Sequence, residues 1–173
     1  IPRPETEELV QLLLDCKPLR ALSSPRILDY GTGSGCIALA IASEMPSSAV
    51  VGVDVSEDAL ALARENADAL GLSGRVSFLN TADVDLADVM EPGAIDAVIS
   101  NPPYIPTASC ARLSPTVRDH EPAGALDGGP DGMEIIRHII EESAILLASG
   151  GFIFLEISAE DRQAGYVSRY MAD

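Results

Sequence analysis

One segment constrains the fold more than any other: an apolar stretch, a glycine-rich turn and an apolar helix start follow one another directly. Arg26 to Tyr30 is typical of a buried strand, Gly31-Thr32-Gly33-Ser34-Gly35 of a tight turn, and Cys36 to Ala42 of a helix start. Glycines permit positive φ and let a ligand approach the backbone, and the free N–H groups of a helix N-terminus favour an anion. The segment predicts an α/β domain with a nucleotide-type cofactor at this turn.

The spacing of the glycines narrows the class of cofactor. A dinucleotide fingerprint has glycine or alanine at its sixth position, where this chain has Cys36, so the pattern is G-x-G-x-G. This favours an adenosyl cofactor without a pyrophosphate. Asp54 ends the second predicted strand, Ala49 to Val53, about twenty residues after the turn, where a carboxylate can accept both ribose hydroxyls. Ser56 or Glu57 is better suited than Asp54 to cap the next predicted helix.

Two further residues have a structural interpretation beside a ligand role. Asp83 follows the third predicted strand, Arg75 to Asn80. Its carboxylate could accept a hydrogen bond from the exocyclic amine of an adenine, with Val84 packed on the ring. A solvated acid in a loop explains Asp83 nearly as well. Thr6 lies at the start of a predicted helix that Pro18 is expected to close. Thr6 is either only a helix-start residue or a residue whose hydroxyl reaches the cofactor.

The predicted fourth strand, Ala94 to Ser100, runs into Asn101-Pro102-Pro103-Tyr104. A residue before proline is held extended, and proline has no N–H to donate. The result is a stiff corner with an amide oxygen, a bare carbonyl and an aromatic ring, which together suit a planar NH2 group. A plain turn is the alternative. The position after a parallel strand favours a ligand site, because open α/β sheets bind ligands beyond the carboxyl ends of their strands.

Strands alternating with helices predict an α/β fold: a doubly wound, mostly parallel sheet with helices on both faces and a cleft beside the first strand. The residues from Ile105 to Pro130 are expected to form a substrate-side loop or lid. A helix from Asp131 to Ala148 and a fifth strand from Phe152 to Ile157 are expected to follow.

Composition excludes several classes of function. The chain has 11 Lys and Arg against 27 Asp and Glu, a net charge of -16, which opposes a broad phosphate-binding face. With 173 residues and 47% hydrophobic content we expect a single domain over residues 1–173. There is no apolar stretch of transmembrane length, so a soluble, cytoplasmic protein is expected, and a start at Ile1 without methionine indicates a fragment. The cysteines and histidines do not have the spacing of a metal site, a disulfide framework or a catalytic triad. They are Cys16, Cys36, Cys110, His120 and His138.

Segments spread over almost the whole chain resemble the class I S-adenosylmethionine-dependent methyltransferases, and within them the HemK/PrmC glutamine methyltransferases of peptide chain release factors. Asn-Pro-Pro-Tyr is shared with amino-adenine DNA methyltransferases, whereas the Pro-Arg-Pro-Glu-Thr opening and the Gly-Gly-x-Asp-Gly segment are similar to HemK/PrmC. Tyr30 stands where leucine is usual. The matching segments are 1–7, 28–35, 101–105, 121–122 with 125–126, 128–132 and 155–157.

The resemblance implies a Rossmann-like methyltransferase domain. Family members usually carry a helical N-terminal substrate domain and a closing C-terminal hairpin, both expected to be absent from this fragment. The resemblance implies residues that contact the methionine end, the ribose and the adenine of the cofactor. These cofactor-binding residues are Thr6, Asp29, Gly31, Thr32, Gly33, Ser34, Gly35, Asp54, Val55, Asp83, Val84 and Asn101. The implied substrate-binding residues are Asn101, Pro102, Pro103 and Tyr104, of which Asn101, Pro102 and Tyr104 are expected to be catalytic.

The implied reaction moves a methyl group from S-adenosyl-L-methionine to the side-chain amide nitrogen of a protein glutamine, in the Gly-Gly-Gln loop of a release factor, and leaves S-adenosyl-L-homocysteine. No metal, membrane or direct nucleic-acid partner is expected. Three alternatives remain: a glutamine methyltransferase of a ribosomal protein, a nucleic-acid amino methyltransferase, and a non-catalytic adenosyl-binding module.

Overall fold

The computed structural model describes residues 3–158 and 163–171. The chain divides into two compact units, and each is described by itself. Unit 1 comprises the residues up to Ser100 together with Glu142–Leu155, and unit 2 comprises Asn101–Glu141 together with the residues from Glu156 onward. A single domain over the whole chain stays a prediction.

Unit 1 holds a five-stranded sheet in the order β3-β2-β1-β4-β5, with every neighbouring pair parallel. The order changes direction at β1, the switch point that the sequence predicts. The strands are β1 (Arg26–Tyr30), β2 (Ala49–Asp54), β3 (Val76–Asn80), β4 (Ile95–Ser100) and β5 (Leu147–Leu155). This confirms the doubly wound α/β fold class.

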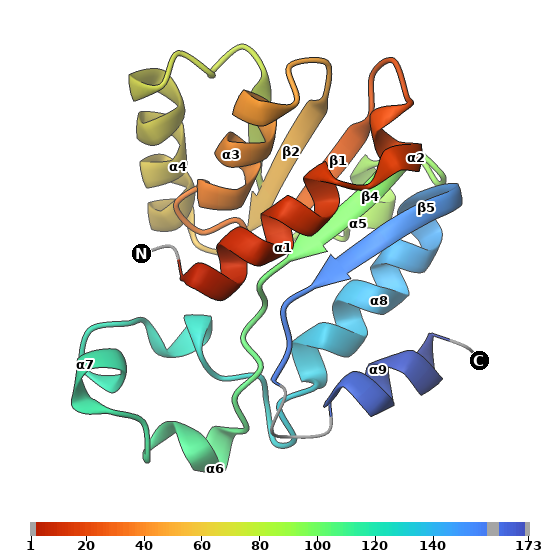
Figure 1. The fold of residues 1–173 in the computed structure, drawn as a ribbon. Helices are drawn as coiled ribbons and strands as arrows, with labels where there is room; N and C mark the ends of the chain where they lie inside the picture. The colour runs from red at the N-terminus through yellow and green to blue at the C-terminus, as the bar shows by residue number, and fades with distance from the viewer. Residues whose placement is uncertain (1–2, 159–162, 172–173) are drawn as a thin grey trace. The chain divides into compact units, whose positions relative to one another are not determined.

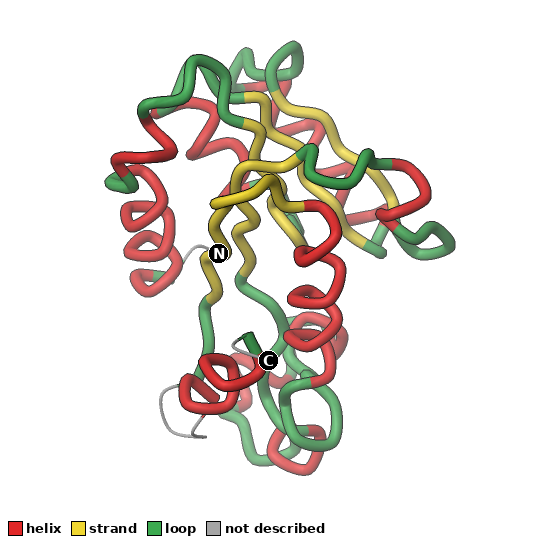
Figure 2. Tube along the Cα trace, turned by 90° about the vertical axis from the view of Figure 1, so that its right-hand side faces the viewer, coloured by secondary structure: helices red, strands yellow, loops and turns green. Residues whose placement is uncertain are grey.

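Helices cover both faces of the sheet (Figures 1 and 2). On one face, α3 packs against β1, β2 and β3, while α1 packs against α3 and β5, and α4 against β2 and β3. The other face carries α5 and the carboxyl end of α8 (Figure 1). The helices that belong wholly to unit 1 are α1 (Pro4–Leu14), α2 (Lys17–Arg20), α3 (Cys36–Glu44), α4 (Glu57–Ala69) and α5 (Leu86–Val89).

Unit 2 is built of short helices and loops. Its loop from Ile105 to Pro130 contains three short helical segments where the sequence predicts only an irregular loop. A parallel bridge between Ile105 and Asp127 brings the two ends of this loop together. The helices are α6 (Thr107–Cys110), α7 (Pro115–Arg118), the 3-10 helix η1 (Ala123–Ala125), the first half of α8 (Glu134–Leu146) and α9 (Gln163–Tyr170).

Several predicted element boundaries are wrong. The helix predicted from Asp131 to Ala148 spans Glu134–Leu146, and the strand predicted to end at Ile157 ends at Leu155. Pro18 does not close the first helix: α1 ends at Leu14, and Pro18 lies in the first turn of α2, where its missing N–H costs nothing. The fifth strand begins at Leu147 rather than Phe152, because β5 pairs Leu147 with Ile95 and resumes at Phe152 opposite Ala97. The irregular stretch between these pairs holds Gly150 at φ +79, and the predicted helix end at Ala148 lies inside β5.

Apolar side chains on the inner faces of the helices and on both faces of the central strands form the core of unit 1. Leu13, Ile27 and Ile41, from α1, β1 and α3, are fully buried in one cluster. The Ser56 side chain accepts a hydrogen bond from the Ala59 N–H at 3.2 Å, which confirms Ser56 as the cap of α4 and leaves Asp54 for other contacts.

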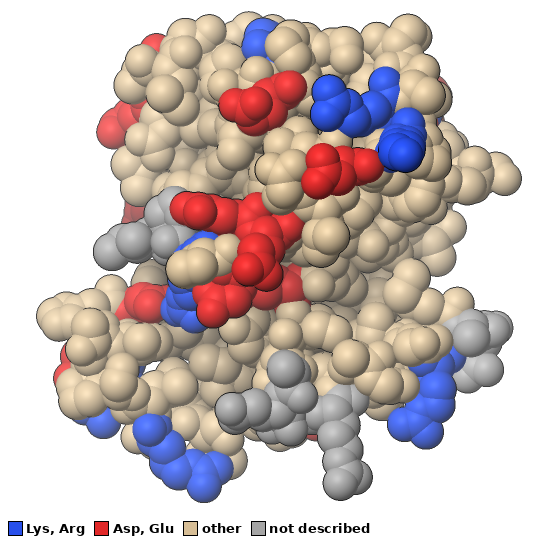
Figure 3. All heavy atoms as spheres, viewed as in Figure 1, with Lys and Arg blue, Asp and Glu red and all other residues tan. Residues whose placement is uncertain are grey.

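Acidic side chains dominate one part of the surface of unit 1. In the view of Figure 3 they gather over the amino-terminal half of α1, whose first turn carries Glu5 and Glu7. Carboxylates at this end of a helix interact favourably with its dipole. In the described part of the chain, no helix is both long enough and apolar enough to span a membrane.

Tyr30, where the resembled family usually has leucine, belongs to a buried polar network. Its hydroxyl donates to Glu142 Oε2 at 2.6 Å, and Glu142 Oε1 accepts from the Leu86 N–H at 3.2 Å. Glu142 is only 8% exposed. Burial, and then the hydrogen bond to Glu142, raise the pKa of Tyr30 well above its ordinary value, so the hydroxyl keeps its proton. The network ties β1 to α8 and α5.

We predict that Tyr30→Phe lowers the free energy of unfolding by about 1–3 kcal/mol, because a buried carboxylate loses one of its donors. Urea denaturation at neutral pH measures the change. The same substitution should cost clearly less in a Glu142→Gln background, where the charge-assisted bond is already absent. Equal losses in both backgrounds would show that the bond contributes nothing.

Candidate functional site

The glycine turn of unit 1 is built around the Asp29 carboxylate. Asp29 is completely buried at the end of β1. Its Oδ2 accepts from the Thr32 hydroxyl at 2.6 Å and from the Ala38 N–H, in the first turn of α3, at 3.0 Å. A buried carboxylate needs such donors, because they replace the water it has lost. One carboxylate therefore joins the strand, the turn and the helix.

Asp54 holds the same turn from the next strand. Its Oδ2 accepts from the Gly33 N–H at 2.8 Å and its Oδ1 from the Ser56 N–H at 2.9 Å. The Thr32 N–H donates to the Val53 carbonyl at 2.9 Å. A carboxylate has about four acceptor positions, so Asp54 keeps capacity for further donors such as hydroxyl groups.

The turn leaves space against its backbone. Gly31 and Gly33 have φ of +70 and +55, and a Cβ built on either would meet no atom within 4 Å. Only glycine adopts this backbone easily, and the open side is where a ligand can lie against it. Asp29 Oδ1 is buried and has no hydrogen-bond partner among the described residues. The open turn, the spare acceptors of Asp54 and the N-terminus of α3 fit an adenosyl cofactor.

The other predicted cofactor residues of unit 1 lie on separate elements. Thr6, in the first turn of α1, is 8% exposed. Val55, directly after β2, is 67% exposed, and Val84, in the loop after β3, is 37% exposed. Asp83 is also exposed, and the Thr81 N–H ties its loop to the Asp54 carbonyl at 3.0 Å. Contacts of these residues with a cofactor stay predictions, as does any direct contact of the buried Asp29.

In unit 2, Asn101 to Tyr104 form an irregular corner, as the sequence predicts. Pro102 is buried within it. Beyond the corner, the Ile105 N–H donates to the Leu126 carbonyl at 3.1 Å, and the Ile105 carbonyl accepts from the Gly128 N–H at 2.9 Å. The Gly-Gly-Pro-Asp-Gly region thus lies directly beside the residues that follow Tyr104.

Sequence reasoning missed one residue at this corner. Gln163, the first residue of α9, is 2% exposed and donates to the Tyr104 carbonyl. A glutamine in a polar stretch after the last predicted strand carries no periodic or motif signal. Only its burial, an uncommon state for glutamine, marks it.

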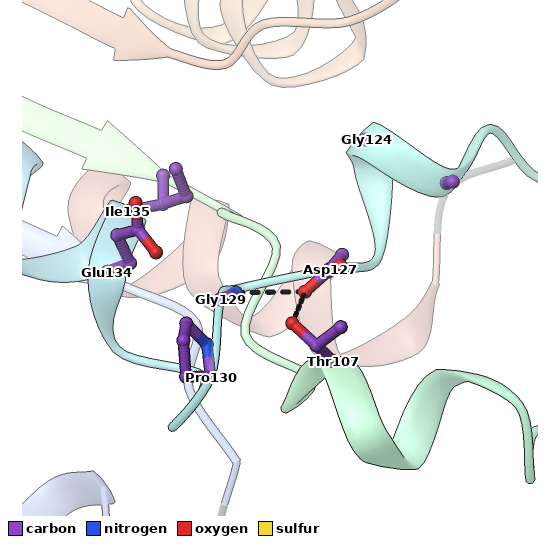
Figure 4. Close-up of a pocket in the computed structure, with 8 residues that line it drawn as sticks. Thr107, Gly124, Asp127, Gly129, Pro130, Glu134 and Ile135 are labelled. Carbon is purple, nitrogen blue, oxygen red and sulfur yellow. Dashed lines mark hydrogen bonds between the residues drawn. The ribbon is translucent and has the colours of Figure 1, made fainter.

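A hollow of about 450 Å³ lies within unit 2 and contains none of the predicted site residues. Figure 4 shows that Asp127 is engaged in the loop structure: its Oδ1 accepts from the Thr107 hydroxyl at 2.7 Å and the Gly129 N–H at 2.9 Å. The residues that line the hollow are Thr107, Ala123, Gly124, Asp127, Gly129, Pro130, Glu134 and Ile135. Among the described residues, no group of three or more His, Cys, Asp or Glu side chains is arranged to hold a metal ion.

Burial raises the pKa of Asp29 to about 7, while the hydrogen bonds from Thr32 and Ala38 act in the opposite direction and the nearby Asp54 charge adds to the rise. The unfolded chain has an ordinary aspartate pKa near 4. The folded state therefore binds this proton more tightly, and the stability that Asp29 contributes is complete below about pH 4 and is lost as the pH rises to about 7.

We predict that Asp29→Asn removes this pH dependence. Relative to the variant, the wild-type protein should lose free energy of unfolding between pH 4 and pH 7, by an amount on the order of a few kcal/mol. Urea titrations across this range measure the difference between the two proteins. The exposed Asp58→Asn serves as the control and should keep the wild-type slope. Identical slopes for the wild type and Asp29→Asn would contradict the prediction.

Known proteins with similar sequences are release factor glutamine methyltransferases. The release factor glutamine methyltransferase of Gloeobacter violaceus is 45% identical over 159 residues, which cover 92% of this chain and 54% of that protein. The human MTRF1L release factor glutamine methyltransferase is 40% identical over 91% of this chain and 48% of its own length. The chain thus spans about half the length of the curated relatives it matches, and the resemblance seen in its motifs is confirmed.

The crystal structure of TrmN from Thermus thermophilus has the same fold, with a TM-score of 0.61 and 29% identity over 94% of this chain and 40% of that one. The methyltransferase small domain family matches residues 7–112, more than half of the chain, and this match includes the glycine turn, Asp54 and the Asn101–Tyr104 corner. The chain belongs to the methyltransferase small domain family.

Proposed function

We propose that this chain is the catalytic part of an S-adenosylmethionine-dependent enzyme that methylates the side-chain amide nitrogen of a protein glutamine, in the Gly-Gly-Gln loop of a peptide chain release factor. The observation that carries the proposal is the Asn-Pro-Pro-Tyr corner, which follows directly on β4 in a chain that also carries the braced glycine turn. The names of the curated relatives support the release factor as substrate. Cytoplasmic translation termination is the setting that goes with such a substrate.

The cofactor part of the proposal rests on unit 1. When bound, S-adenosylmethionine supplies an electrophilic sulfonium methyl group. The backbone of Gly31–Gly35 would lie against its methionine end, and Asp54 would accept the ribose hydroxyls. The capacity of Asp54 beyond its bonds to Gly33 and Ser56 supports this assignment.

The substrate part rests on the corner. An amide nitrogen is a poor nucleophile because its lone pair is delocalised, so most of the rate must come from positioning. The Asn101 side-chain oxygen and the Pro102 carbonyl would accept the two N–H hydrogens of the substrate amide, and Tyr104 would cover its plane. Accepting both hydrogens raises the electron density on nitrogen as the new bond to carbon forms. The proton leaves afterwards to solvent, so the chain needs no strong base.

The acidic balance of the chain favours a protein over a nucleic acid as substrate. With 11 basic against 27 acidic residues it offers few groups to neutralise phosphates. The test must still separate three alternatives: methylation of a ribosomal-protein glutamine, methylation of a nucleic-acid amine, and cofactor binding without catalysis.

The test incubates the full-length protein with methyl-labelled S-adenosylmethionine and a release factor, and locates the label by mass spectrometry. We expect label on the Gly-Gly-Gln glutamine and none on a release factor with alanine at that position. Asn101→Ala should slow transfer at least about 100-fold, a barrier increase of about 2.7 kcal/mol. Its affinity for S-adenosylhomocysteine should stay close to that of the wild type.

Label on a ribosomal protein or on RNA instead would replace the release factor with that substrate. Cofactor binding with no transfer to any of these would favour the non-catalytic module. Unchanged turnover in Asn101→Ala would exclude the proposed role of the corner.

A separate prediction concerns the cofactor. Asp54→Asn should weaken binding of S-adenosylhomocysteine at least about 10-fold, equal to about 1.4 kcal/mol, because one acceptor oxygen becomes an NH2 donor facing a hydroxyl. Isothermal titration calorimetry measures the affinity. The matched control is Asp58→Asn, since Asp58 is an exposed acid on α4 and should bind as the wild type does. Undiminished affinity in Asp54→Asn would remove Asp54 from the cofactor site.

A further inference from the structure

Gln163 uses its side-chain amide fully, inside unit 2. Its Nε2 donates to the Tyr104 carbonyl at 2.9 Å and to the Gly132 carbonyl at 3.2 Å. Its Oε1 accepts from the Ser158 N–H at 2.9 Å. Both N–H hydrogens and the carbonyl oxygen thus have backbone partners, and the side chain is 2% exposed. One amide group therefore links three backbone segments that are distant in sequence.

Glycines let these segments come close enough for the link. A Cβ on Gly132, whose φ is +72, would overlap the Tyr104 carbonyl oxygen. A Cβ on Gly128 would lie 2.7 Å from the Pro103 carbonyl oxygen and 2.8 Å from Tyr104 Cα. Real Cβ atoms do not approach so closely, so the Gly128–Gly132 segment packs backbone to backbone against the end of the corner.

The prolines explain why the corner needs an outside donor. Pro102 and Pro103 have no N–H, so the corner cannot fix its peptide planes by its own backbone bonds there. The plane of the Tyr104–Ile105 peptide is held at both ends: the Ile105 N–H donates to the Leu126 carbonyl, and Gln163 supplies the donor for the Tyr104 carbonyl. That plane in turn limits how Tyr104 and the preceding carbonyls can rotate.

Helix α9 has an attachment of its own beside Gln163. The Arg137 guanidinium lies 5.8 Å from the centre of the Tyr166 ring, and it also forms a two-bond ion pair with Asp131. The Tyr166 and Tyr170 rings are stacked with centroids 5.8 Å apart, and the Tyr170 hydroxyl donates to Glu141. None of these contacts involves Gln163, so we expect the packing of α9 on the first half of α8 to persist when Gln163 is replaced.

We propose that Gln163 is a positioning residue for the transfer reaction: with the Gly128–Gly132 segment it clamps the Tyr104 carbonyl and so holds the Asn-Pro-Pro-Tyr corner in the shape that receives the substrate amide. This rests on the proposed function of the corner and adds a residue to it. Gln163 contacts neither substrate nor cofactor in this role. Its effect passes through the Tyr104 peptide.

Gln163→Glu tests the clamp with almost no change of shape. Burial raises the pKa of the new carboxyl group, so kcat is measured at a pH above it. There the carboxylate still accepts from the Ser158 N–H but cannot donate, so the Tyr104 and Gly132 carbonyl oxygens face a like partial charge. We expect kcat for release factor methylation to fall at least about 10-fold, a barrier increase of about 1.4 kcal/mol. KM for S-adenosylmethionine should stay within about twofold, because the braced turn of unit 1 is untouched. Lowering the pH should bring kcat back toward the wild-type value, because the new carboxyl group regains a donor when it is protonated.

Gln11→Glu is the matched control, since Gln11 is exposed on α1 and acquires the same charge without losing a buried bond. Hydrogen exchange of the Tyr104 and Ile105 amides gives a second readout that does not depend on activity. We expect these amides to exchange at least about tenfold faster in Gln163→Glu than in the wild type or Gln11→Glu, with α3 and α4 unchanged.

The two readouts separate the clamp from the proposed function. If the wild-type protein methylates no release factor, the proposed function fails, while faster exchange at Tyr104 and Ile105 in Gln163→Glu still supports the clamp. If exchange is unchanged, the clamp is wrong whatever the activity. Faster exchange with wild-type kcat would show that the clamp is structural only and would overturn the positioning role.

Discussion

The buried Asp29 carboxylate is the constraint on which unit 1 depends. A carboxylate removed from water is costly unless donors surround it, and here they come from Thr32 in the turn and Ala38 in the helix. Satisfying one buried group thus fixes the end of β1, the path of the glycine turn and the start of α3 together. Asp54 pulls the turn toward β2 through the Gly33 N–H. These hydrogen bonds within the protein define the shape of the turn, and a defined shape lowers the entropy cost of binding for any ligand that the turn receives.

The corner of unit 2 follows a different logic. Two prolines stiffen its chain and remove two backbone donors, so the corner has more backbone acceptors than donors. That is useful for receiving an NH2 group, and it also means that the shape of the corner must be set by donors from elsewhere. Gln163 is such a donor at the Tyr104 carbonyl. An amide side chain binding to carbonyl oxygens there has the same chemistry that we propose for the substrate glutamine.

A doubly wound sheet does not by itself say what a chain does, because the same architecture supports many reactions. What distinguishes this chain is local: an acid that ends β2 with acceptor capacity to spare, and a proline corner that follows β4. The methyltransferase small domain family covers both features.

The sequence by itself determined the features that depend on neighbours in the chain. The strand, turn and helix from Arg26 to Glu44, the Ser56 cap and the irregular corner at Asn101 all follow from local patterns and backbone preferences. Local rules failed at two places. Pro18 fits a helix start as well as a helix end, and the residues at the start of β5 fit a strand pairing as well as the end of a helix.

Only the tertiary structure decided which distant polar groups meet. Tyr30 and Glu142 are separated by 112 positions, and Gln163 and Tyr104 by 59. No local pattern marks such pairs, because a hydrogen bond between them exists only after folding has buried both and excluded water. The same holds for Asp29, whose motif indicates a ligand but whose burial makes it the brace of the turn. The sequence directly shows which residues are neighbours along the chain. Only the folded chain removes polar groups from water, and this desolvation is what makes each of them require a particular hydrogen-bond partner.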